Sequence, residues 1–404
     1  MRMFARIFAK VCLSALCAVV LLIVWFVLLI VMQSSFLSHA LWLDGVVCCG
    51  AFLIFLLLIW KPFAAKIRKR IALGITAAVV VVFFGVSGVR AYQDSIPSVK
   101  TDISNLRSYE PFRENTLAKS LGEPSTLHLE GDLPRLDGAT ALYPVYSAFV
   151  RAVYPEADYI YFPDKTGGGN DTVICTNTVN AFYNLLNGAA DIAFLADISD
   201  DQKQEADQRG IKLKFTPIGK EAFVFIINSR NPVSNLTTDN IRDIYSGKIT
   251  NWSQVGGGSD AIRAYQRAKN SGSQTALEHI MGGAPLMTPP QQDVYDFMDG
   301  LYKAVADYKN YKNALGYSFR YYVINMMAGG GVKLLSINGV EPSARNIANG
   351  AYPFTGDFYA VTVEREPLTD AEKARADNAD KLIQWILSPQ GQSLVEKTGY
   401  VARG

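Results

Sequence analysis

The sequence contains few of the residues that bind metal ions or form disulfides. Its three histidines, His39, His128 and His279, are scattered, and no two cysteines have the CxxC spacing of a zinc or redox motif. Four of the five cysteines lie within the first 49 residues, which leaves Cys175 alone in the rest of the chain. The sequence therefore predicts no metal site, no cofactor and no internal disulfide beyond residue 49.

Positive charge is scarce outside the N-terminal region. The formal net charge is +2, but eight cations beside the first apolar runs contribute +8, so the remaining chain carries −6. A mildly acidic main body argues against nucleic acid as a partner. The eight cations are Arg2, Arg6, Lys10, Lys61, Lys66, Arg68, Lys69 and Arg70.

Long apolar runs occur only in the first ninety residues, at 11–32, 41–60 and 71–89. Each is long enough to cross the ~30 Å hydrocarbon layer of a bilayer. Basic residues lie in the segment before the first run and in the loop between the second and third runs. The loop between the first and second runs has no Lys or Arg. Because cationic loops stay in the cytoplasm, we expect a three-helix membrane anchor over residues 1–92, a linker over 93–124 and an extracytoplasmic domain over 125–404.

The domain alternates between strand and helix patterns, which is typical of the α/β class. A short strand, a glycine turn and a helix are expected over 134–153, which places Thr140 and Ala141 at a helix N-terminus. A second helix is expected to begin near Thr178. The buried-strand pattern of 191–196 places Asp197 at the C-terminal edge of a sheet, where ligands of open α/β sheets gather.

The stretch 267–282 combines a cation, two hydroxyls, a glycine and a helical pattern. Ser271, Gly272 and Ser273 are expected at the start of a helix, where unpaired N–H groups and the helix dipole favour an anion. Arg267 offers a planar fork for an oxyanion. The alternative is an ordinary serine N-cap on a surface helix with an unrelated arginine nearby.

These residues, together with 222–228 and the segment 246–252 (Ser-Gly-Lys-Ile-Thr-Asn-Trp), resemble the phosphate-binding proteins of high-affinity phosphate ABC transporters. The resemblance covers roughly residues 130–404. It implies a two-lobed type II periplasmic-binding-protein fold, with lobe one over 125–223 and 355–404 and lobe two over 224–354. It also implies that the chain binds inorganic phosphate or a similar oxyanion and has an ABC transporter permease as partner. Together with the predicted spans, this places the chain in a bacterial cytoplasmic membrane.

The resemblance implies a set of ligand-binding residues. One position departs from the family: its site aspartate falls on Ala196 in a gapless count, and Asp197 is one residue further on, which leaves the selection of phosphate over sulfate open. The implied residues are Thr140, Ala141, Thr178, Asp197, Arg267, Ser271, Gly272 and Ser273.

Three functions remain open from the sequence. The first is a membrane-tethered receptor whose lobes close on phosphate and deliver it to a transporter. The second is an anion sensor that signals through a membrane partner. The third, a phosphate-ester hydrolase, ranks last, because the sequence shows no grouping of a nucleophile with a base and no cluster of metal ligands.

Overall fold

The computed structural model describes residues 106–161, 171–289, 294–295, 298–306, 312–327, 331–365 and 369–403, together with the single residues Arg70 and Gly74. The chain forms two compact units, residues 1–97 and 98–404, and all of these ranges lie in the second. Within the described ranges, no helix is both long and apolar enough to cross a bilayer. The three predicted spans lie outside the described residues, apart from Gly74.

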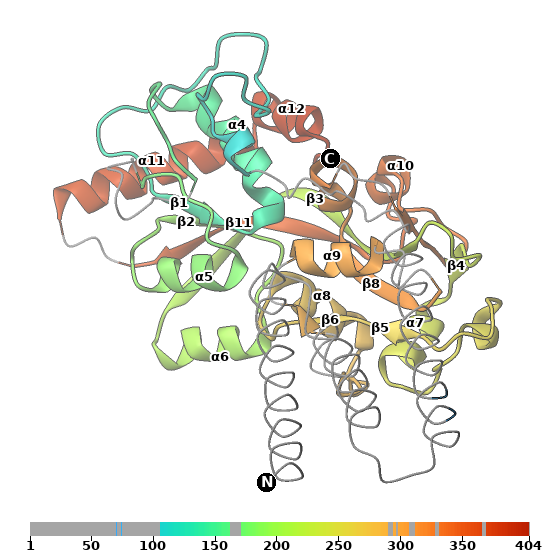
Figure 1. Cartoon of the computed structure of the whole chain (residues 1–404). Helices are drawn as coiled ribbons and strands as arrows, with labels where there is room; N and C mark the ends of the chain where they lie inside the picture. Colours follow the sequence, from blue (N-terminus) through green and yellow to red (C-terminus); the bar gives the residue numbers. More distant parts are fainter. Residues whose placement is uncertain are drawn as a thin grey trace, which may run out of the picture. The chain divides into compact units, whose positions relative to one another are not determined.

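Helices and strands alternate along the second unit (Figure 1). The α-helices are α4 (Tyr143–Val153), α5 (Thr178–Leu186), α6 (Asp200–Gln208), α7 (Thr238–Tyr245), α8 (Gly272–Met281), α9 (Met298–Ala306), α10 (Ala344–Ala348), α11 (Asp370–Ile386) and α12 (Pro389–Thr398). Short 3₁₀ turns are η1 (Leu106–Tyr109), η2 (Thr140–Leu142) and η3 (Trp252–Val255), and η6 (Tyr322–Met326) is a π-helical turn.

The strands are β1 (Leu136–Gly138), β2 (Ile192–Leu195), β3 (Lys212–Asn228), β4 (Asn235–Leu236), β5 (Arg263–Ala264), β6 (Gln266–Arg267), β7 (Val294–Tyr295), β8 (Ala314–Phe319), β9 (Val332–Leu334), β10 (Ser336–Ile337) and β11 (Thr355–Glu364). The main sheet has the order β1-β2-β11-β3-β8-β5, with β9 also paired to β3. Parallel pairs (β1 with β2, β5 with β8) stand beside antiparallel ones, so the predicted mixed α/β class is confirmed.

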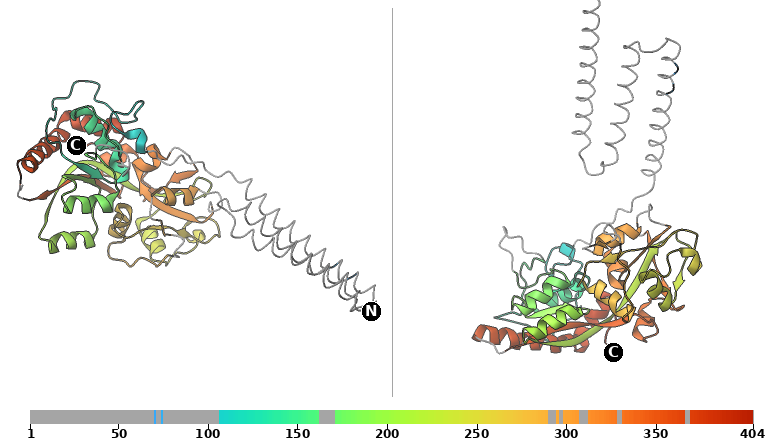
Figure 2. Two further views of the ribbon diagram at one scale, coloured as in Figure 1. Left: turned by 60° about the vertical axis from the view of Figure 1, so that its left-hand side comes forward. Right: turned by 90° about the horizontal axis from the view of Figure 1, so that it is seen from below.

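One long strand, β3, joins two halves of the sheet. Its first part pairs with β11 up to Ala222, which lies opposite Thr355, and its second part pairs with β8 from Phe223 onward. We call the half with β1, β2, β11, α4–α6, α11 and α12 lobe one, and the half with β8, β9, β5 and α7–α10 lobe two. The views in Figure 2 show α5 and α6 in green on one half and α9 in orange on the other. The long strand β3, with β11 beside its first part, therefore connects the two lobes.

Helices cover both faces of the lobe-one sheet. Along β2, Ile192 and Phe194 belong to the core shared with α4 and α12, whereas Ala193 and Leu195 belong to a second core with α5 and α6. This alternation follows from the two-residue period of a strand. Figure 1 accordingly shows α4 and α12 on the opposite side of the sheet from α5 and α6.

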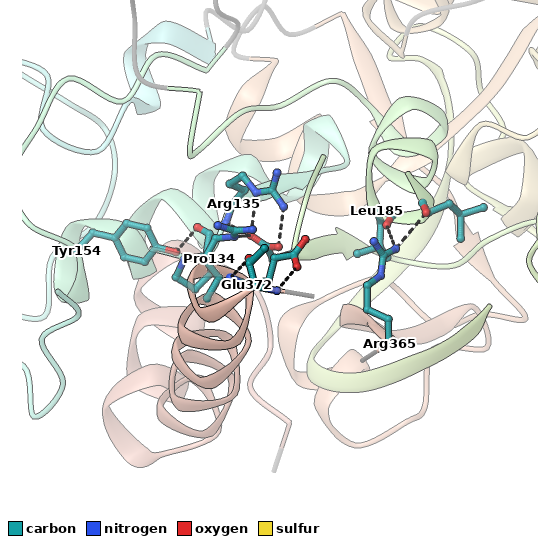
Figure 3. Close-up of polar contacts among 10 residues, drawn as sticks. Pro134, Arg135, Tyr154, Leu185, Arg365 and Glu372 are labelled. Carbon is teal, nitrogen blue, oxygen red and sulfur yellow. Dashed lines mark hydrogen bonds and ion pairs between the residues drawn. The ribbon is translucent and has the colours of Figure 1, made fainter. Parts of the chain in front are cut away.

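Charged side chains fix the end of lobe one where β2 begins (Figure 3). The Arg135 guanidinium donates to both oxygens of Asp191, Nε to Oδ2 at 3.0 Å and Nη2 to Oδ1 at 2.8 Å. Arg365 Nη2 donates to the carbonyls of Leu185 (3.2 Å) and Leu186 (3.1 Å) at the C-terminus of α5. The Arg365 contacts hold the C-terminal end of α5, whose first residue is Thr178.

Residues 106–124, which we call the proximal segment, belong to the predicted linker 93–124 and pack onto the domain. Tyr109, Ala118 and Leu121 are buried. Arg151 of α4 donates to the carbonyl of Ala118, and Lys397 of α12 donates to that of Leu121. This packing could not be predicted from local pattern, since the apolar residues of the segment are isolated and show no helical or strand period.

Candidate functional site

A cavity of about 210 Å³ brings together seven of the eight predicted ligand-binding residues. It lies between the lobes, because α5 belongs to lobe one and α8 to lobe two. Figure 1 shows α5 and α8 in their respective halves. We call this cavity the anion pocket. Its walls include Thr140, Ala141, Thr178, Arg267, Ser271, Gly272 and Ser273, and also Ala139, Asn177, Val179, Asn180, Ala268, Lys269 and Phe319.

The N-termini of helical segments from both lobes line the anion pocket. In lobe two, Ser271 caps α8, and its side chain accepts from the Gln274 N–H at 3.3 Å. In lobe one, Asn177 caps α5 and accepts from the N–H groups of Val179 and Asn180 at 3.0 and 3.1 Å. The η2 turn that begins at Thr140 leads directly into α4. The first N–H groups of such segments have no partner within the helix, so they favour an anion between them.

Arg267 supplies a buried positive charge to the anion pocket. Its side chain is largely enclosed, with 9% of the residue exposed. Its backbone N–H donates to the Tyr317 hydroxyl (2.8 Å) and to Gln274 Oε1 (3.0 Å), while Nη1 donates to Ser273 Oγ at 3.2 Å. Strand β6 and helix α8 thus hold the guanidinium beside the start of α8, where it can add charged hydrogen bonds to an oxyanion.

The two lobes approach each other closely where the N-termini of α5 and α8 meet. A Cβ atom added to Gly272 would lie 2.9 Å from Thr178 Oγ1 of the opposite lobe. Side-chain carbons do not approach other atoms this closely without a shift. The absence of a side chain at residue 272 therefore lets the N-termini of α5 and α8 come together.

We expect Gly272→Ala to weaken anion binding about tenfold, because overpacking of about 1.4 kcal/mol at this contact would oppose closure of the lobes. The measurement is calorimetric titration with phosphate. Gly258→Ala is the matched control, since Gly258 is exposed and a Cβ added there would make only an ordinary contact, 3.6 Å from Asp260 Oδ2. Equal affinity of the Gly272→Ala variant and the parent would show that the α5–α8 contact does not limit closure.

Asp197 does not lie among the walls of the anion pocket. It lines an adjoining cavity of about 400 Å³, which shares Gly272 and Phe319 with the anion pocket. There its Oδ2 lies 3.1 Å from Nδ1 of His279 on α8, and its Oδ1 accepts from the Ile198 N–H. The structure therefore separates Asp197 from the other seven predicted residues, and Ala196, where the family's site aspartate falls in a gapless count, lines the same adjoining cavity.

Seven residues that line the anion pocket were not among the predicted ligand-binding residues, and four of these seven have polar or aromatic side chains. Asn177 could have been found, because it precedes an apolar helical stripe and has the capping chemistry of asparagine. Lys269 could also have been suspected from its place beside Arg267; it pairs with Asp201 of lobe one at 2.5 Å. Asn180 and Phe319 carry no local signal, since only the folded chain brings α5 and the end of β8 together. Within the described ranges, no group of three potential metal ligands is found.

Comparisons with known proteins agree with this geometry. A family model described as a PBP superfamily domain matches residues 135–390. The phosphate-binding protein PstS of Borreliella burgdorferi is 24% identical over 212 residues, which cover 51% of this chain and 71% of that protein. PstS of Bacillus subtilis is 31% identical over 161 residues, which cover 39% of this chain and 50% of that protein.

The same likeness extends to solved structures. A putative phosphate ABC transporter substrate-binding protein from Clostridium perfringens, solved with bound phosphate, superposes with a TM-score of 0.51 and 26% identity. The match covers 67% of this chain and 99% of that one. Because the family model alone extends over more than half of the 404 residues, this chain belongs to the PBP superfamily.

Proposed function

We propose that this chain is a binding protein that captures inorganic phosphate, or a similar oxyanion, between its two lobes for uptake by an ABC transporter. The observation that carries the proposal is the anion pocket, where Arg267 and helical N-termini from both lobes converge. The relatives named PstS and the phosphate-bound structural neighbour support phosphate as the ligand. The chain acts by binding and release, not by catalysis.

The position of the domain in the cell is part of the same proposal. The apolar runs 11–32, 41–60 and 71–89 anchor the chain in a bacterial cytoplasmic membrane, with the domain on the extracytoplasmic face. An anchored receptor would remain close to its permease, so that each captured anion is released near the transport path. Cysteine accessibility tests the orientation: a reagent that does not cross membranes should label a cysteine introduced at exposed Lys203 in intact cells from which any outer membrane has been removed.

Calorimetric titration of the full chain in detergent, after removal of bound anion, tests the ligand. We expect saturable one-to-one binding of phosphate, with chloride and acetate inactive. Sulfate is the informative competitor, because Asp197 lies outside the anion pocket and its part in selectivity is open. Absence of phosphate binding at any pH would overturn the proposed ligand, and turnover of phosphate esters would overturn the assignment as a binding protein.

A second function, anion sensing through the N-terminal region, is favoured by the contacts of the proximal segment with both lobes. Its Tyr109 carbonyl accepts from Ser147 of lobe one, while the Tyr109 hydroxyl donates to the Asn325 carbonyl of lobe two at 3.5 Å. Beside it, Tyr321 stacks on Tyr400 with ring centroids 4.1 Å apart. A change in the angle between the lobes would therefore alter the contacts of the proximal segment, which leads to the N-terminal region.

Hydrogen exchange tests this coupling. We expect phosphate to slow amide exchange in residues 106–121 of the full chain, because closure fixes the contacts that the segment makes with both lobes. The Arg267→Ala variant serves as control, since it should not respond to the same phosphate concentration. Unchanged exchange in these residues, under conditions where the parent binds phosphate, would remove the support for sensing.

A further inference from the structure

A buried carboxylate lies directly behind the lobe-one side of the anion pocket. Asp137, the central residue of β1, is completely buried. Its Oδ1 accepts from the N–H groups of Gly138 (2.7 Å) and Thr176 (2.8 Å). Its Oδ2 accepts from Thr176 Oγ1 (2.5 Å) and from Asn184 Nδ2 (2.8 Å). Both oxygens are thus held by two donors each, the pattern expected of an ionised carboxylate.

The partners of Asp137 lie on the two segments that supply the lobe-one walls of the pocket. Gly138 ends β1 and leads, through Ala139, into the η2 turn that contains Thr140 and Ala141. Thr176 immediately precedes the α5 cap and stands two residues before Thr178, and Asn184 belongs to α5 itself. One side chain therefore links the turn after β1 to the beginning and the body of α5.

The surroundings of this linkage are tightly packed. A Cβ atom added to Gly138 would lie 2.7 Å from the Phe194 carbonyl oxygen, so the turn after β1 rests directly on β2. Burial raises the pKa of the Asp137 carboxyl, and the hydrogen bonds from Thr176 and Asn184 oppose that rise. Burying this carboxylate is costly, and four donors compensate for that cost. Such an arrangement fixes the positions of the segments that carry the donors.

We propose that Asp137 is a positioning residue of the anion pocket: it sets the separation between the Thr140–Ala141 turn and the N-terminus of α5. Without it, the N–H of Thr176 and the amide of Asn184 lose their acceptor, and the start of α5 can rotate away from the turn. The donors that meet the oxyanion would then no longer be preorganised. The proposal rests on the proposed function, since it assigns a role within the same site.

The test compares Asp137→Asn with Asp191→Asn in the full chain. Asp191 is a matched control, because it is also a lobe-one aspartate held by several hydrogen bonds, but its three donors all belong to Arg135 and it lies just before β2, away from the walls of the anion pocket. We expect Asp137→Asn to weaken phosphate binding about tenfold or more. Asp191→Asn should lower the melting temperature and leave the phosphate Kd within about twofold of the parent.

Thr176→Val provides a second, milder variant that removes one hydrogen bond to Asp137. We expect it to weaken phosphate binding in the same direction, and to add little when combined with Asp137→Asn, because both changes break one linkage. If Asp137→Asn does not fold, the phosphate affinities of Thr176→Val and Asp191→Asn are compared instead, and weaker binding by Thr176→Val alone supports the positioning role. Parent-like phosphate affinity in the folded Asp137 and Thr176 variants would overturn the positioning role, whereas failure of the parent to bind phosphate would overturn the proposed function instead.

Discussion

Arg267→Ala is expected to weaken phosphate binding about a hundredfold or more. The substitution removes a buried guanidinium that lies beside Ser273 at the start of α8. Truncating one partner of a buried charged pair costs about 3 kcal/mol, which corresponds to about two orders of magnitude in Kd. Calorimetry measures the loss directly. Thermal unfolding gives a second reading, since a saturating ligand raises the melting temperature only when it binds the folded state.

Two comparisons sharpen this prediction. Lys269→Ala removes a cation that also lines the pocket but is exposed and paired with Asp201, so it should weaken binding by less than about fivefold. Arg267→Lys retains the charge but not the planar fork and should fall between the two. If Arg267→Ala bound phosphate as tightly as the parent, the anion would have to sit elsewhere, and the adjoining cavity with His279 would be the next place to look.

Glu221→Gln is expected to remove a pH-dependent change of about 3 kcal/mol in the free energy of unfolding. Glu221 lies in β3 at the connection between the lobes, is almost fully buried, and accepts from the N–H groups of Ala222 (2.8 Å) and Tyr321 (3.2 Å). Burial raises the pKa of its carboxyl from 4.5 to about 7. A shift of this size corresponds to about 3 kcal/mol of difference between folded and unfolded states.

The sign follows from proton binding. Between pH 4.5 and about 7 the folded chain holds a proton on Glu221 that the unfolded chain has released, so this residue's contribution to the free energy of unfolding falls as pH rises. Between about pH 4 and pH 8, the free energy of unfolding of the parent should therefore fall by about 3 kcal/mol relative to that of Glu221→Gln. Chemical unfolding of both proteins at these two pH values measures the difference. A difference that stays constant with pH would show that burial of Glu221 does not perturb its titration.

Local signals predicted the individual helix starts of the site. Ser271 precedes a helical apolar stripe that ends at glycine, and the helix observed begins at Gly272. Thr178 is likewise the first residue of α5. These features depend on neighbouring residues, because capping is a contact between a side chain and N–H groups two or three positions along the chain.

Contacts between distant segments were harder to anticipate. Nothing near Phe319 in the sequence indicates that the end of β8 lies against the anion pocket. Helix α6 was missed because it is mostly polar and buries only Gln202 and Ala206, so it has almost no apolar stripe. Asp197 was placed in the site because it follows a buried strand, but both Ala196 and Asp197 line the adjoining cavity, so position at the edge of the sheet did not identify which cavity the side chain lines.

The central claim is that the anion lies between Arg267 and the N-termini of α5 and α8. Arsenate is a tetrahedral anion of the same charge type as phosphate and scatters anomalously, so its position can be measured in crystals of the protein grown with it. The account predicts one strong anomalous peak in the anion pocket, within hydrogen-bonding distance of the Arg267 guanidinium, with Thr140 and Thr178 on its lobe-one side. A peak beside Asp197 and His279, with the anion pocket empty, would contradict the account.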